Sequence, residues 1–84
     1  MASGLRIELI SRHRCHLCDQ AQDLLERLRQ EQPFDYDVLD VDSDPNLVLY
    51  YNHRVPVLRI DGREVAELVF SEDAVRQALR SHRE

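Results

Sequence analysis

Two cysteines carry the clearest capacity for chemistry in this 84-residue chain. Cys15 and Cys18 are its only cysteines, and they are separated by two residues within the stretch S-R-H-R-C-H-L-C-D-Q, residues 11–20. A C-x-x-C pair can exchange disulfides, supply two ligands to a metal site or anchor a haem. The spacing alone leaves these uses open, so the flanking residues have to distinguish them.

The neighbouring residues weigh against haem and zinc. A c-type haem anchor requires a histidine directly after the second cysteine, where this chain has Asp19. A structural zinc site takes four ligands, and His13 and His16 alternate with the cysteines too closely to complete a tetrahedron comfortably. The distant His53 and His82 are isolated, and we interpret them as surface residues. We therefore expect no metal and favour redox exchange, with zinc as the weaker alternative.

The two cysteines are expected to have unequal environments. Apolar residues recur at helical spacing and predict a helix over residues 16–31, with Cys15 at its mouth and Cys18 one turn inside. The positive helix end, together with Arg12 and Arg14, favours a thiolate at Cys15. Cys18 falls on the apolar stripe and should be less exposed and less ionised. These positions predict Cys15 as the nucleophile and Cys18 as the thiol that resolves the mixed disulfide.

The elements that must position this pair can be predicted along the whole chain. Alternation of apolar and polar residues indicates strands at 5–10, 34–41, 55–60 and 63–68. Asp44-Pro45 starts a short helix that Asn52 is expected to close in the left-handed conformation, and Ser71 caps a last helix. Asp61-Gly62 predicts a tight hairpin between the last two strands. The order βαβαββα predicts an α/β protein with a mixed four-stranded sheet flanked by helices, as in the thioredoxin fold.

These motifs together resemble the small glutaredoxin-like proteins of the thioredoxin superfamily. The resemblance covers essentially the whole chain, through S-R-H-R-C-H-L-C, D-V-D-S-D-P-N-L, R-V-P-V-L and the Asp-Gly hairpin. It implies thiol–disulfide exchange linked to glutathione or thioredoxin. It also implies that the Val55-Pro56 bond is cis, and that the backbone of Val55 pairs with the substrate. Arg12 and Arg54 occupy positions where relatives often place charged groups for the glutathione carboxylates.

Two departures from the family pattern concern glutathione. His16 and Leu17, which we include among the substrate-contacting residues, stand where glutaredoxins commonly have Pro and Tyr. Val69-Phe70 stands where they commonly have a Gly-Gly pair that lets the backbone approach the γ-glutamyl group. The helix that Ser71 caps could still bind a carboxylate, although Phe70 would crowd the groove and Glu72 would repel the anion. We therefore expect weak activity with glutathione.

Composition sets the remaining expectations. An apolar share of 43% is typical of a folded protein, and we expect one glutaredoxin-like domain over residues 1–84. A net charge of −5 argues against nucleic acid as a partner. No apolar run is long enough for a membrane span, and Arg6 and Glu8 interrupt the N-terminal apolar segment, so a cytoplasmic location is expected. We also expect a monomer.

The sequence thus predicts a thiol–disulfide oxidoreductase acting on protein or low-molecular-weight disulfides. It would have no tightly bound cofactor, with glutathione as a possible co-substrate or the thioredoxin system as reductant. The alternative is a non-catalytic binding module that uses the groove at the cis proline for a protein partner.

Overall fold

Four strands form one mixed sheet in the computed structural model, which describes residues 5–83. The strands lie in the order β2-β1-β3-β4, so β1 and β3 are central. β1 is parallel to β2 and antiparallel to β3, and β3 is antiparallel to β4. The bounds are β1 Ile7–Ser11, β2 Asp37–Asp40, β3 Val57–Ile60 and β4 Arg63–Glu67. The predicted domain also included residues 1–4 and 84, which lie outside the described residues.

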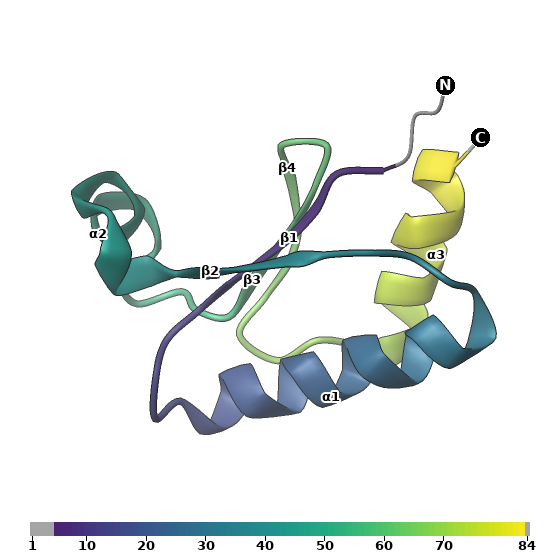
Figure 1. The fold of residues 1–84 in the computed structure, drawn as a ribbon, viewed down its shortest axis with the longest axis horizontal. Coiled ribbons are helices and arrows are strands. Elements are labelled where there is room, and N and C mark those ends of the chain that lie inside the picture. Colours follow the sequence, from purple (N-terminus) through teal and green to yellow (C-terminus); the bar gives the residue numbers. More distant parts are fainter. Residues whose placement is uncertain (1–4, 84) are drawn as a thin grey trace.

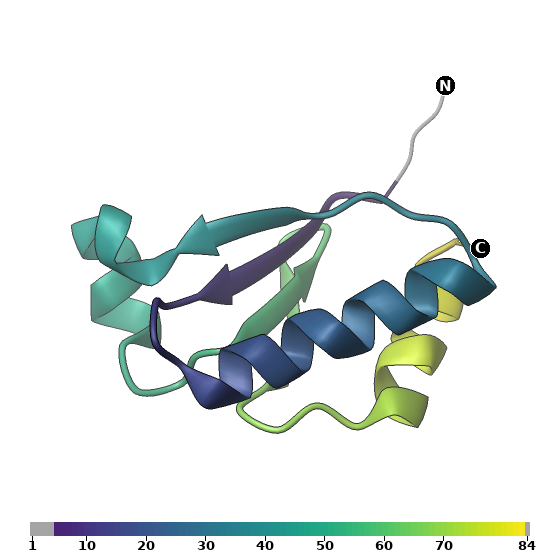
Figure 2. The ribbon, with the colours of Figure 1, turned by 60° about the horizontal axis from the view of Figure 1, so that its bottom comes forward.

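Two of the three helices cover one face of the sheet, and the third covers part of the other (Figures 1 and 2). They are α1 His16–Glu31, α2 Pro45–Tyr51 and α3 Glu72–Arg83. α1 and α3 pack against the same side of the strands, whereas α2 lies at one end of the sheet on the opposite side. This arrangement confirms the predicted α/β fold with its βαβαββα order.

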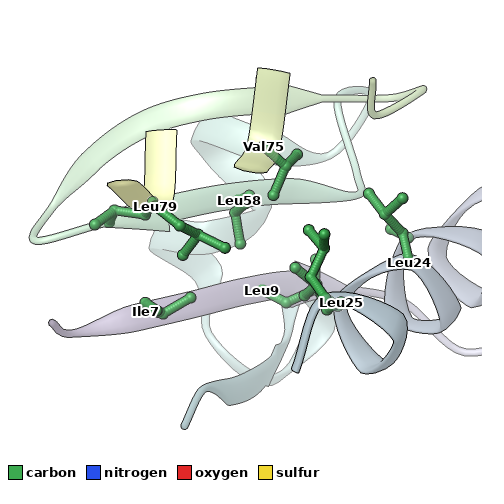
Figure 3. Close-up of a cluster of buried hydrophobic side chains, with 10 residues drawn as sticks. Ile7, Leu9, Leu24, Leu25, Leu58, Val75 and Leu79 are labelled. Carbon is green, nitrogen blue, oxygen red and sulfur yellow. The ribbon is translucent and has the colours of Figure 1, made fainter. Parts of the chain in front are cut away.

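The main core lies between the sheet and the pair α1 and α3. Apolar residues at helical spacing in α1 meet alternate residues of β1 and β3, because both periodicities place their apolar side chains on one face. Figure 3 shows seven of these side chains converging: Ile7, Leu9, Leu24, Leu25, Leu58, Val75 and Leu79. A smaller cluster under α2 contains Ile10, Val41, Tyr51 and Val57.

The face of the sheet under α2 also carries a row of charged residues, one from each strand. Strand register places Asp37 beside Glu8, Glu8 beside Arg59, and Arg59 beside Glu64. Glu8 is 7% exposed and accepts an ion pair from Arg59, with Nη2 and Oε1 2.9 Å apart. α2 is short and covers only part of this face of the sheet. The charge of the buried Glu8 is compensated by its ion pair with Arg59.

The predicted Asp61-Gly62 hairpin is confirmed. Both residues have positive φ, 51° and 83°, as a two-residue hairpin turn with matching twist requires. Asp61 also links this turn to the residue before β1, because its Oδ1 accepts a hydrogen bond from the Arg6 backbone N–H at 2.9 Å.

Other local expectations differ from the structure. Asn52 is right-handed, with φ −48° and ψ −44°, so the prediction of a left-handed helix end there was wrong. The strand predicted over 34–41 spans only Asp37–Asp40. It ends at Asp40 because the side chain of this residue accepts a hydrogen bond from the Asp42 N–H and starts a 3-10 turn over Val41–Ser43. The strand predicted from residue 55 begins at Val57, since Pro56 has no N–H for the ladder.

Candidate functional site

Cys15 and Cys18 form a disulfide at the start of α1. Cys15 is the N-cap residue, and its Sγ accepts a hydrogen bond from the Cys18 backbone N–H at 3.1 Å. The Cys15 side chain is half-buried, whereas Cys18 is 1% exposed and packs within the protein. The unequal environments expected for the two cysteines are therefore present.

Arg12 connects the loop before Cys15 to α2 and to the turn that follows β2. Its Nε and Nη2 each lie 3.0 Å from a carboxylate oxygen of Asp42, in a bidentate pair. The same guanidinium donates to the Asn52 backbone oxygen at 3.1 Å and to its side-chain Oδ1 at 2.6 Å. The hydrogen bonds from Arg12 hold the pKa of Asp42 below its usual value. A substrate carboxylate at Arg12 would have to displace Asp42, and the role expected for Arg12 with glutathione stays a prediction.

The Val55-Pro56 bond is cis, as the resemblance implies. Register places Val57 opposite Ile10, so the proline lies at the same end of the central strands as the loop that leads from β1 to Cys15. Pro56 is buried, and its backbone oxygen accepts a hydrogen bond from the Leu68 N–H at 2.8 Å. The site thus joins three segments: the start of α1, the cis-proline segment and the residues after β4.

Arg54 holds the cis-proline segment against β4. Its guanidinium donates to Glu67 at 2.8 and 3.0 Å and also bonds Glu64. It lies over the Tyr51 ring, with its central carbon 5.2 Å from the ring centroid. Hydrogen bonds to Glu64 and Glu67 raise the pKa of Arg54, and the same contact lowers the pKa of Glu64. Like Arg12, Arg54 is occupied by the protein's own carboxylates.

Ser71 caps α3, since its Oγ accepts a hydrogen bond from the Ala74 N–H at 3.2 Å. Glu72, expected to repel an incoming carboxylate, is itself paired: its carboxylate lies 2.9 Å from Arg76 Nη2 and 3.4 Å from Arg27 Nη2. The negative charge of Glu72 is therefore largely compensated by these two arginines. Phe70 packs against the main core and lines a cavity beside α1.

His16 and Leu17, the two residues between the cysteines, point to different surroundings. His16 is exposed, and its Nε2 lies 3.1 Å from the Gln20 side-chain nitrogen. Leu17 is half-buried and lines the same cavity as Phe70. Of the two, Leu17 is the one that lines this cavity.

Sequence reasoning missed Leu68. Its φ is 64°, a left-handed conformation that a bulky residue seldom adopts, so no propensity argument could have placed it. The one available signal was the pair Val69-Phe70, directly after Leu68, at the place where relatives commonly have Gly-Gly. Sequence reasoning also missed the acidic partners of the arginines, because no local pattern pairs Arg12 with Asp42, which lies 30 residues away.

The fold and the disulfide-bonded C-x-x-C pair define the class of protein. The structure resembles that of a mutant thioredoxin from Halobacterium salinarum NRC-1, with a TM-score of 0.68 and 28% identity, over 98% of this chain and 77% of that one. It also resembles the X-ray structure of protein XcR50 from X. campestris, with a TM-score of 0.77 and 36% identity, over 89% and 96% of the two chains. This is a thioredoxin-fold protein with a C-x-x-C pair.

The sequence comparisons identify the family within this class. The model of the glutaredoxin-like domain (DUF836) matches residues 6–80, and the chain belongs to this family. An uncharacterized protein of Mycobacterium tuberculosis is 34% identical over 64 residues, which is 70% of this chain and 66%, just under two thirds, of that protein. Within residues 5–83, no helix has the length and apolar character needed to cross a membrane.

Proposed function

We propose that the protein is a thiol–disulfide oxidoreductase in which Cys15 attacks and Cys18 resolves. The observation that supports this most is the disulfide between a helix-capping, partly exposed cysteine and a cysteine that is 1% exposed. Backbone N–H groups at the start of α1 favour negative charge on Cys15, and the hydrogen bond from Cys18 N–H already reaches its sulfur. Substrate access to Cys18 is blocked by burial, which leaves it available for the intramolecular step.

The reaction balances as two successive exchanges. The Cys15 thiolate bonds to one sulfur of the substrate disulfide, the substrate S–S bond breaks, and the other sulfur leaves as a thiolate that takes a proton from water. Cys18 then loses its proton and attacks Cys15, which releases the second substrate thiolate and closes the Cys15–Cys18 disulfide. The substrate gains two electrons and the protein loses two. A thiol reductant, glutathione or a thioredoxin-type dithiol, would return the pair to the reduced form.

Single-cysteine variants test the assignment of roles. Reduced Cys18→Ser should accumulate a mixed disulfide at Cys15 with a disulfide substrate, detected as a mass increase in intact-protein mass spectrometry. Cys15→Ser should lose turnover altogether, because the remaining thiol is buried. Full reductase activity in Cys15→Ser would show that the roles are wrongly assigned. No adduct on Cys18→Ser and no turnover by the unmodified protein would favour the non-catalytic binding module.

A further inference from the structure

A cavity of about 290 Å³ opens between α1 and the segment that joins β4 to α3. Most of its lining side chains are apolar: Leu17, Ala21, Leu24, Leu68, Val69 and Phe70. Leu17, which stands between the two cysteines in the sequence, is one of the lining residues, so the cavity lies beside the start of α1. A substrate bound at Cys15 that extends past Leu17 would meet this cavity.

The cavity has a fixed floor and an uncovered rim. Leu24 and Phe70 belong to the packed core, which holds the floor in place. Val69 is 74% exposed and Leu68 is 40% exposed, so the rim presents apolar area to solvent. Burial of such area gains about 25 cal/mol for each Å² removed from water. An apolar group bound here would be stabilised by burial against both the floor and the rim of the cavity.

The charges around the cavity are balanced. Asp23 and Arg27 stand at its edge, and Arg27 shares Glu72 with Arg76. A small charged thiol such as glutathione carries two carboxylates that need cationic partners. The arginines expected to supply them, Arg12 and Arg54, are already bound to the protein's own acids. An uncharged side chain needs no such partner.

We propose that this cavity receives a large apolar side chain next to the reactive cysteine of a polypeptide substrate, and so selects protein disulfides over glutathione. The inference rests on the proposed function and names the substrate class of the same site. The cavity residues take no part in the sulfur exchange. They hold the substrate cysteine near Cys15 through the neighbouring side chain, which makes Val69 a specificity-determining residue.

Two capped tripeptides of matched size test this directly. Each carries a cysteine as a mixed disulfide with thionitrobenzoate, preceded by leucine in one peptide and by asparagine in the other. The reduced protein, in excess, attacks the peptide sulfur and releases coloured thionitrobenzoate. Rates are divided by those of N-acetylcysteine with the same peptides to remove intrinsic reactivity. We expect the leucine peptide to react about tenfold faster than the asparagine peptide, since one apolar group in a fitted pocket carries about this discrimination. The thionitrobenzoate disulfide of glutathione should also react more slowly than the leucine peptide.

Two surface variants of equal exposure localise the effect. Val69→Gln should reduce the leucine preference to within about twofold, whereas Leu49→Gln, on α2 and likewise 74% exposed, should retain it. The inference is overturned if the unmodified protein shows no leucine preference, or if both variants behave alike. If Val69→Gln fails to fold, the two peptides on the unmodified protein decide the matter. If neither peptide releases thionitrobenzoate faster than the reference thiol, the proposed oxidoreductase function itself fails, and the substrate class falls with it.

Discussion

At the scale of single residues, Arg12 and Arg54 act as internal braces around the reactive pair. Arg12 joins the loop before Cys15 to Asp42 and Asn52, which are 30 and 40 residues further along the chain. Arg54 joins the segment before the cis proline to Glu67 on the edge strand. Each guanidinium uses the fork geometry that suits two oxygen acceptors, which lysine cannot reproduce. The braces tie the cysteine loop to the end of α2 and the cis-proline segment to β4.

Removal of the Arg12 brace should affect both stability and rate. We expect Arg12→Ala to lower the free energy of unfolding and to slow the attack by Cys15 by roughly threefold to tenfold, because the cysteine loop loses its fixed position. The loss in free energy of unfolding should depend on pH. The pKa of Asp42 is lowered in the folded protein, so its contribution is present above the ordinary aspartate pKa, about 3.9, and is lost as the pH falls through the lowered value.

Urea unfolding at several pH values checks this expectation. The difference between Arg12→Ala and the unmodified protein should be largest near neutral pH and should shrink as the pH falls below about 4. Arg63→Ala is the matched control, because Arg63 is exposed and forms none of the ion pairs seen in residues 5–83. Equal effects of the two substitutions at neutral pH would remove the case for a brace at Arg12.

At the scale of elements, the segment after β4 departs from the pattern of the family, in which a Gly-Gly pair is common there. Leu68 has a left-handed backbone that glycine adopts without steric cost. Its N–H bonds the Pro56 oxygen at 2.8 Å, so the unfavourable conformation is maintained by contact with the cis-proline segment. The same leucine contributes its side chain to the apolar rim of the cavity. Leu68 thus combines an unfavourable backbone conformation with an apolar side chain that lines the cavity.

Leu68→Gly separates these two properties. Relief of the positive φ stabilises the fold, and loss of a partly buried leucine side chain destabilises it, so the net change should stay within about 1 kcal/mol. The variant should gain activity with glutathione, because backbone replaces the side chain at the groove. Val69→Gly, at a position without positive φ, should instead lose about 0.5–1 kcal/mol. Thermal unfolding and a glutathione-coupled assay measure both. A large loss of stability in Leu68→Gly, or no gain with glutathione, would contradict this account of Leu68.

At the scale of the whole molecule, local patterns in the sequence account for the architecture. The helical spacing from Leu17 to Leu28 predicts the bounds of α1, and Asp61-Gly62 predicts the hairpin, because both depend on neighbouring residues alone. The partners of Arg12, the conformation of Leu68 and the handedness of Asn52 depend on contacts between distant segments. No propensity encodes those contacts. The same division holds for the site: spacing identifies its cysteines, and only the folded chain shows which charges are free to meet a substrate.

The reduction potential of the Cys15–Cys18 pair tests the central claim most directly. The protein is equilibrated in buffers of defined dithiol-to-disulfide ratio, quenched by alkylation and counted by mass spectrometry as reduced or oxidised. The account predicts one reversible two-electron transition with a midpoint of roughly −200 to −270 mV, the range spanned by glutaredoxins and thioredoxin. A pair that forms no disulfide under mild oxidation, or one that a strong dithiol fails to reduce, would contradict it.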